Sequence, residues 1–171
     1  MVAPGGNLDD ARLAKIRPDG SDATNLAGAC TGTCLSDGFP AFDTSGQLIA
    51  FERILGPAEG EKNLRAIFVM DADGANARQV TQPGASSEEP NHPDDGGPTF
   101  APTGTLIAFD RRDPDTGLHA IFTAGLDGTG EFQVTPWDLD AAQPDFSPDG
   151  LDPVPLQRDV RDGRERLAGA P

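Results

Sequence analysis

The chain has 171 residues and lacks any long apolar run. Its longest strongly apolar stretch, "AIFVM" at residues 66–70, is far shorter than the roughly 20 residues that a membrane-spanning helix needs. The start, "MVAPGGNLDD", has neither the basic region nor the apolar region of a signal peptide. We therefore expect a soluble protein without membrane insertion. Export stays open, because a start inside a longer reading frame would also remove a signal peptide.

Basic residues are scarce: 13 Lys and Arg stand against 28 Asp and Glu, which gives a net charge of −15. An acidic surface repels phosphate backbones and anionic lipids, so we expect no nucleic-acid partner. Such a charge would attract cations or basic partners. The alternative explanation is that it only keeps the protein soluble.

Cysteine is limited to Cys30 and Cys34, the first and last residues of the short stretch "CTGTC". A local disulfide there would indicate an oxidising compartment, and two free thiols are the alternative. Two thiols make only half a zinc site, and neither His92 nor His119 stands at a ligand-like spacing from them. The sequence therefore predicts no zinc site.

Recognisable catalytic motifs are missing. The chain has no Gly-x-Ser-x-Gly elbow, no Ser/His/Asp order typical of a triad and no glycine-rich phosphate loop. His92 and His119 are the only histidines, and we interpret both as solvated loop residues. The prediction is a protein that is not an enzyme and that has no catalytic residues.

What the chain does contain is a repeat. "FDTSGQLIAF" at 42–51 returns as "FAPTGTLIAF" at 100–109, and "FSPDG" at 146–150 begins a third copy. A second phrase reads "AIFVMDADGANARQVT" at 66–81 and "AIFTAGLDGTGEFQVT" at 120–135. Self-similarity at such spacings is the signature of a repeat architecture.

A weaker copy of the second phrase, "LAKIRPDGSDATNLA", stands at 13–27. The glycines Gly20, Gly74 and Gly128 of the three copies are evenly spaced along the chain. The repeat therefore extends almost to the start of the chain.

Each unit is predicted to form four antiparallel strands, such as "PTF", "TLIAFDR", "HAIFTAG" and "EFQVT". Short apolar runs bounded by turn residues are typical of buried strands, and Asp-Gly pairs favour tight turns between them. One such sheet cannot bury both faces alone, but radial stacking of sheets in a β-propeller does so. A solenoid of hairpins is the competing fold, with units usually shorter than these spacings.

The predicted fold class is all-β: an incomplete β-propeller within residues 1–150, built of four-stranded antiparallel blades. Complete blades are expected at about 38–81 and 97–135, with the last two strands of a blade before them and the first strand of one after. Residues 151–171 contain two early prolines and balance four arginines with four acids. The prolines argue against a central strand there, and we interpret this stretch as a non-propeller tail that is disordered or translated out of frame.

The repeats resemble those of TolB-like β-propellers over about residues 11–150. "FSPDG" at 146–150 matches that family's pattern letter for letter. The earlier copies match it at Phe100, Pro102, Gly104, Ile107, Ala108 and Phe109, and at Phe42, Gly46, Ile49, Ala50 and Phe51. Such families close rings of six or more blades, so the resemblance implies a fragment of a longer protein or an open arc that needs partners.

The resemblance implies a noncatalytic binding or scaffold module for protein–protein interaction at the bacterial cell envelope, in a periplasmic or extracellular place. Uncovered blade faces would favour self-association. An alternative is the propeller portion of a prolyl-oligopeptidase-like serine peptidase whose catalytic domain is absent here. A third is a sugar- or lactone-acting propeller enzyme with calcium in its channel.

Two groups of candidate site residues follow. Asp71, Asp73, Asp113 and Asp115 place pairs of nearby carboxylates in turns, which suits calcium, although Asp also serves turns for backbone reasons. Trp137 in "TPWDLD" is either an exposed partner anchor or a ring packed over the blade edge. No other cofactor is expected.

Overall fold

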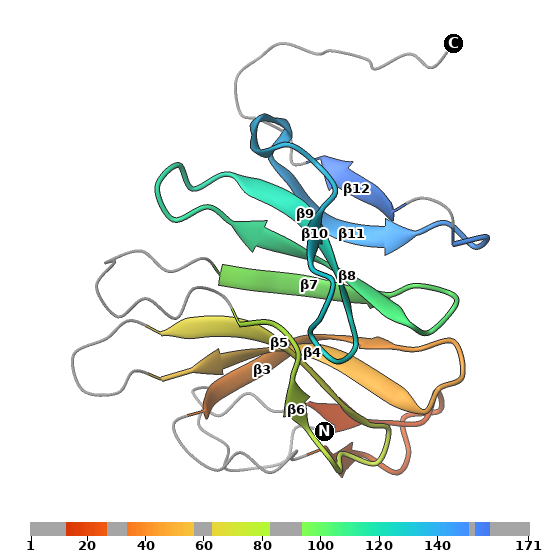
Figure 1. Ribbon diagram of the computed structural model, residues 1–171. Coiled ribbons are helices and arrows are strands. Elements are labelled where there is room, and N and C mark those ends of the chain that lie inside the picture. The colour runs from red at the N-terminus through yellow and green to blue at the C-terminus, as the bar shows by residue number, and fades with distance from the viewer. Residues whose placement is uncertain (1–12, 27–33, 57–62, 83–93, 151–152, 158–171) are drawn as a thin grey trace.

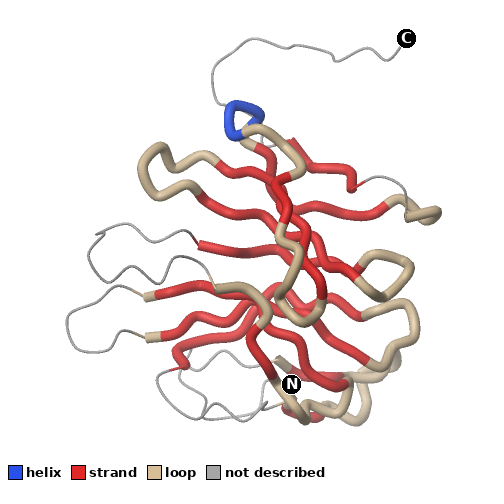
Figure 2. The backbone as a smooth tube through the Cα atoms, in the orientation of Figure 1, coloured by secondary structure: helices blue, strands red, loops and turns tan. Residues whose placement is uncertain are grey.

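The computed structural model describes residues 13–26, 34–56, 63–82 and 94–150, and the backbone of the strand at 153–157. Sheets are stacked one above the next along the chain, from the N-terminal hairpin to the C-terminal one (Figures 1 and 2). Among the described residues, no helix is long and apolar enough to cross a membrane.

Two four-stranded antiparallel sheets form the centre, and in each the strands lie in chain order. The first contains β3 (Cys34–Phe42), β4 (Leu48–Leu55), β5 (Leu64–Asp71) and β6 (Arg78–Gln79). The second contains β7 (Asp94–Phe100), β8 (Leu106–Arg112), β9 (His119–Gly125) and β10 (Phe132–Gln133). The all-β prediction of two four-stranded blades is thereby confirmed, with first strands that begin a few residues earlier than expected.

A two-stranded sheet precedes the first blade. It pairs β1 (Ala14–Lys15) with β2 (Thr24–Asn25), through Ala14↔Asn25 and Lys15↔Thr24. The equivalent register joins β5 to β6 in the first blade and β9 to β10 in the second. The hairpin is therefore the third and fourth strand of a blade, as the weak repeat predicts.

A second two-stranded sheet follows the second blade, and here one prediction is wrong. β11 (Ala141–Phe146) pairs with β12 (Pro153–Gln157), although we expected residues 151–171 to lie outside the propeller. The register Phe146↔Pro153 matches Phe100↔Ile107 in the blade before, so β12 occupies the place of a second strand.

The prolines are tolerated because of where their nitrogens point. In the second blade the Leu106 carbonyl accepts the Ala101 N–H, so Leu106 faces β7 and Ile107 faces the opposite way. By the matching register, the nitrogens of Pro153 and Pro155 face away from β11, toward the open edge of the sheet. The N–H that proline lacks would not have formed a hydrogen bond with β11, so no inter-strand bond of this pair is lost. Residues 151–152 and 158–171 lie outside the described residues, and the hypotheses of a disordered or out-of-frame tail stay predictions.

The largest apolar core lies between the two complete blades. The first blade contributes residues that include Ile67, Val69 and Val80, and the second contributes Phe109 and Phe122, all at most 9% exposed. This packing buries the faces that a lone sheet would leave in water, and apolar burial is the main favourable term in folding.

Turn glycines fit the blades together. A Cβ on Gly128, in the β9–β10 turn, would lie 2.5 Å from the Val80 carbonyl oxygen of the first blade. Gly74, the equivalent glycine of the first blade, approaches Leu26 of the N-terminal hairpin in the same way, at 3.4 Å from its Cα. Both glycines have positive φ, which favours glycine at each turn, and at Gly128 the short distance to Val80 requires it as well.

Equivalent phenylalanines show where a blade is uncovered. Phe100 belongs to the core between the blades and is 5% exposed, whereas Phe42, its equivalent in the first blade, is 52% exposed. The described residues before β3 supply only β1 and β2, so no first or second strand covers Phe42 among them.

We predict that Phe100→Ala lowers the free energy of unfolding by about 3–5 kcal/mol, because it opens a cavity in the core. Phe42→Ala, the matched control, should cost about 1 kcal/mol or less. Urea unfolding followed by circular dichroism measures both. Equal losses would show that the two faces are equally covered in solution.

Candidate functional site

Each complete blade contains a buried Asp–Arg pair between its first two strands. Arg53 Nε and Nη2 donate to the two carboxylate oxygens of Asp37, at 2.6 and 2.8 Å. Arg111, at the equivalent position of the second blade, binds Asp95 in the same bidentate way, at 2.6 and 2.9 Å. Buried charges are tolerated only when paired and hydrogen-bonded, and this geometry satisfies that condition.

Aromatic rings complete the surroundings of each arginine. The Arg53 guanidinium carbon lies 5.0 Å from the ring centroids of both Phe51 and Phe68. Arg111 lies at 5.4 and 4.8 Å from the equivalent rings of the second blade. Such cation–π contacts add to the ion pair and hold the arginine in place.

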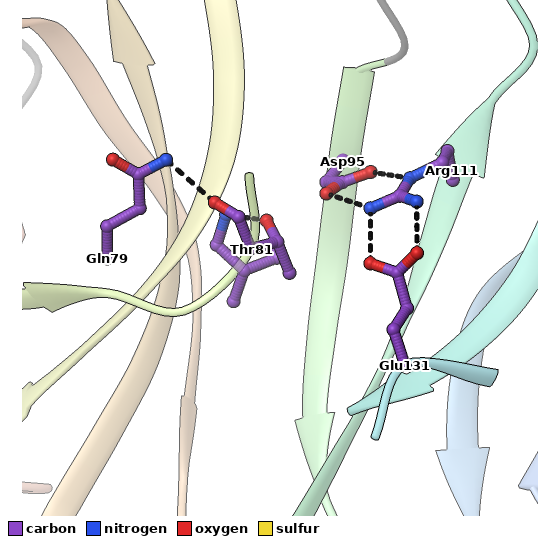
Figure 3. A network of polar contacts seen from close by, with 6 residues as sticks. Gln79, Thr81, Asp95, Arg111 and Glu131 are labelled. Carbon is purple, nitrogen blue, oxygen red and sulfur yellow. Dashed lines mark hydrogen bonds and ion pairs between the residues drawn. The ribbon is translucent and has the colours of Figure 1, made fainter. Parts of the chain in front are cut away.

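Arg111 has a second carboxylate partner (Figure 3). Its Nη1 and Nη2 donate to the two oxygens of Glu131, at 2.6 and 2.9 Å. Burial lowers the pKa of Arg111, but the bonds to Asp95 and Glu131 outweigh burial and raise it above its usual value. Ala77 stands at the equivalent position of the first blade, so that blade does not repeat the Glu131 contact.

The third unit has lost both members of the pair. Ala141↔Gln157 occupies the register position of Asp95↔Arg111. A lone buried charge would be costly, and replacement of both partners avoids that cost.

A cavity of about 300 Å³ opens beside Asp95 and is lined from three successive units. Its charged lining consists of four carboxylates and two guanidinium groups: Glu52, Asp94, Asp95, Asp110, Arg65 and Arg112. Phe39, Gly96, Gly97, His119 and Gln143 complete the described lining. Asp95 is already paired with Arg111, but the other carboxylates give the cavity an acidic character.

A bulge in each first strand shapes this cavity. Phe39, Gly97 and Gln143 have φ of 48°, 55° and 54°, and each stands before a proline at an irregularity of strand pairing. A residue before proline favours extended backbone, and positive φ is costly for a bulky side chain. Phe39 is therefore held in a strained conformation at the cavity.

Two buried acids reach toward the next unit. Glu52 and Asp110 occupy equivalent positions of β4 and β8 and are 5% and 9% exposed. Asp110 Oδ1 accepts the Gln143 backbone N–H at 2.9 Å and so ties β11 to the second blade. A Cβ on Gly96 would lie 2.9 Å from Glu52 Oε2, so glycine there gives that carboxylate room.

Glu52 lies in an unfavourable electrostatic environment. Its Oε1 is 3.4 Å from Nη1 of Arg65, whose side chain is 47% exposed. Burial raises the pKa of Glu52 above its usual value; Arg65 opposes this rise, and the charges of Asp110 and Asp94 add to it. Among the described lining residues, four carboxylates stand against two guanidinium groups.

His119 also faces this cavity. Its backbone N–H donates to Asp140 Oδ1 at 2.9 Å, and its ring Nδ1 lies 3.2 Å from the same oxygen. The side chain is only 12% exposed, so the prediction of a solvated loop residue is wrong for His119. His92 lies outside the described residues.

The four calcium candidates are not brought together. Asp71 and Asp73 lie at the β5–β6 turn, whereas Asp113 and Asp115 lie in the β8–β9 loop at the opposite end of the strands (Figure 1). Asp73 accepts the Ala75 N–H at 2.9 Å and Asp113 accepts the Asp115 N–H at 2.8 Å, which are ordinary turn bonds. In the part of the chain that the structure describes, no group of three or more His, Cys, Asp or Glu could hold a metal ion.

Trp137 and Cys34 each have a defined setting. Trp137 begins a short 3-10 helix (Trp137–Leu139), and its ring packs 5.6 Å from that of Phe122 against the core. Of the two interpretations of Trp137, the structure shows packing over the blade edge. Cys34 is disulfide-bonded, and Cys30, the only other cysteine of the sequence, lies outside the described residues.

The sequence offered a signal for the cavity that we did not interpret. "DGFP" at 37–40 and "DGGP" at 95–98 stand at the same spacing as the "LIAF" repeats, and they contain the paired aspartate and the bulge. The partner arginine of each aspartate comes from the next strand, and only the folded hairpin brings the two together.

Comparison with known proteins finds similarity in structure alone. No family model matches the chain, and no curated protein matches it. TolB from Acinetobacter baumannii aligns with 81% of this chain and 41% of its own, at 14% identity and a TM-score of 0.36. A putative TolB from Agrobacterium tumefaciens aligns with 88% of this chain and 72% of its own, at 19% identity and a TM-score of 0.36.

This chain spans less than half the length of the Acinetobacter protein. The assignment of blades rests on the strand order and registers described above.

Glu52 should make the fold less stable as the pH rises. Its folded pKa is raised above its unfolded value, near 4.5, so the folded state binds its proton more tightly. Ionisation of Glu52 therefore removes stability as the pH rises from about the unfolded pKa through the folded one. We predict that Glu52→Gln gains stability relative to the wild type between pH 4 and pH 7, measured by urea midpoints. Asp73→Asn, an exposed control, should show no such gain; a constant difference between Glu52→Gln and wild type would contradict the prediction.

Proposed function

We propose that this chain is a noncatalytic β-propeller module that binds a protein partner, with the acidic cavity at its docking face. The observation that carries the proposal is the construction of the cavity: β3, β7 and β11, the first strands of three successive units, all contribute to it. A site of this kind depends on the stacked array rather than on one blade. A partner that docks there would contact several repeats at once.

The chemistry of the cavity favours binding over catalysis. Its described lining offers carboxylates, guanidinium groups, an amide, an imidazole and an aromatic ring, and contains no Ser, Thr or Cys side chain. Hydrolysis of the serine- or cysteine-peptidase type requires such a hydroxyl or thiol next to a base. His119 is bonded to Asp140, but a nucleophile does not accompany this pair in the described lining.

The net charge of −15 supports a basic partner surface, because complementary charge steers association and increases its rate. The disulfide bond of Cys34 supports an oxidising location, such as the periplasm or the cell exterior. The half-exposed Phe42 on the uncovered face supports additional contacts there, either with more blades or with another copy.

The proposal predicts salt-sensitive protein binding that depends on the cavity. The full chain, immobilised and exposed to a bacterial envelope extract, should retain a defined protein, and purified partner should bind with an affinity that falls as salt rises. Asp94→Asn, at the half-buried cavity rim, should weaken binding severalfold, whereas the charge-matched control Asp73→Asn at the opposite end should not.

Turnover would contradict this proposal. The same preparation should be assayed against peptide, glycoside and lactone substrates with and without a chelator. Hydrolytic activity that co-purifies with the chain would show that the assignment is wrong. Equal partner binding by Asp94→Asn and the wild type would do the same.

A further inference from the structure

We propose that the cavity is a receptor for a basic side chain, in which carboxylates bind a guanidinium or ammonium group and Phe39 stacks on it. This inference rests on the proposed protein-binding function and specifies the chemistry that the partner presents. Three features of the cavity support it: its charge balance, its aromatic residue and the space beside its glycines.

The charge balance leaves room for one more cation. Among the residues that the structure describes, four carboxylates and two guanidinium groups line the cavity. Arg111 pairs with both Asp95 and Glu131, so these three side chains together have a net charge of −1. Counted with Arg111 and Glu131, five carboxylates stand against three guanidinium groups, an excess of two negative charges.

Glu52 has a longer ion pair than the buried aspartates of the two blades. Its side chain is 7% exposed, and its ion pair with Arg65 is 3.4 Å long, against 2.6 Å for the Arg53 and Arg111 pairs. Arg65, the second residue of β5, has a side chain that is 47% exposed. A ligand cation can therefore add to Glu52 or replace Arg65 there.

Phe39 is the second feature, and it is unusual in two independent ways. The residue is 55% exposed and lines the cavity, and its backbone is held at φ of 48°. The equivalent position in the next unit is Gly97, which adopts this conformation without strain. An exposed aromatic ring beside buried carboxylates matches the combination that recognises guanidinium and ammonium groups.

The glycines supply the space. Gly96 and Gly97 bring bare backbone next to Glu52 and Asp110, where a Cβ would come within 2.9 Å of a carboxylate oxygen of each. A bound metal ion is less suitable, because no group of three potential ligands exists among the described residues. A planar cation on a flexible side chain can reach separate carboxylates and the ring together.

The test uses the full chain and two capped tripeptides, acetyl-Gly-Arg-Gly-amide and its citrulline counterpart, followed by NMR titration. Citrulline keeps the shape of arginine and removes its charge. The arginine peptide should bind saturably, and the citrulline peptide at least about tenfold more weakly, because charge-assisted hydrogen bonds are lost.

Three variants locate the site. Glu52→Gln should lower the affinity for the arginine peptide about tenfold. Arg65→Gln should raise that affinity, because a competing cation is removed. Phe39→Gly should weaken it severalfold while the chain stays folded, since glycine relieves the positive φ. Asn76→Gly is the matched control: it also replaces a residue at positive φ, at the other end of the blade, and should bind like the wild type.

Equal binding of the two peptides would overturn the inference, as would wild-type affinity in both Glu52→Gln and Phe39→Gly. If Glu52→Gln does not fold, Phe39→Gly and Arg65→Gln still test the inference. Both positions are exposed, so these variants should fold. A different result would separate the two proposals: a protein partner binds the wild type and Phe39→Gly equally, and the arginine peptide does not bind. That result would agree with the proposed function and contradict this inference. Arginine-peptide binding without any protein partner would support the cationic site and contradict the proposed function.

Discussion

Every part of this structure depends on the burial of both faces of a four-stranded sheet. The Ile, Ala and Phe of "LIAF" in β4 and β8 are at most 1% exposed, so alternate residues need cover on opposite sides of the sheet. One sheet cannot supply that cover, and the next copy of the same sheet does. The turn glycines Gly74 and Gly128, which lie close against the preceding unit, follow from this packing.

Polar groups are arranged within the constraint that the stacking imposes. Asp37 with Arg53 and Asp95 with Arg111 neutralise buried charge inside each blade, and Asp110 holds the backbone of the following unit. Where the repeats differ, the differences are local. Phe39 replaces the bulge glycine of the next unit, and Glu131 replaces Ala77. The proposed binding chemistry lies at one of these differences, at Phe39.

Much of the fold could be predicted from the sequence, because each strand carries its own signal. "AIFVM" and the Asp-Gly turns predict β5 and β9 with their turns, since apolar runs and turn residues act locally. The cavity could not be predicted in the same way. The Asp95–Arg111 pair joins two strands across a bulge, and His119 meets Asp140 only through the 3-10 helix that follows the second blade. β12 was missed because two prolines argue against a central strand, whereas β12 is an edge strand.

The central claim, that successive blades pack face to face through their turns, is tested most directly at Gly128 with Gly130 as the reference. Both glycines have positive φ, so alanine strains the backbone at each, but only at Gly128 would the new Cβ meet the neighbouring blade, 2.5 Å from the Val80 carbonyl oxygen. At Gly130 the Cβ would meet nothing within 4 Å. The account predicts that Gly128→Ala loses about 1–3 kcal/mol more unfolding free energy than Gly130→Ala. Equal losses would show that the blades do not touch there, and the stacked array would be wrong.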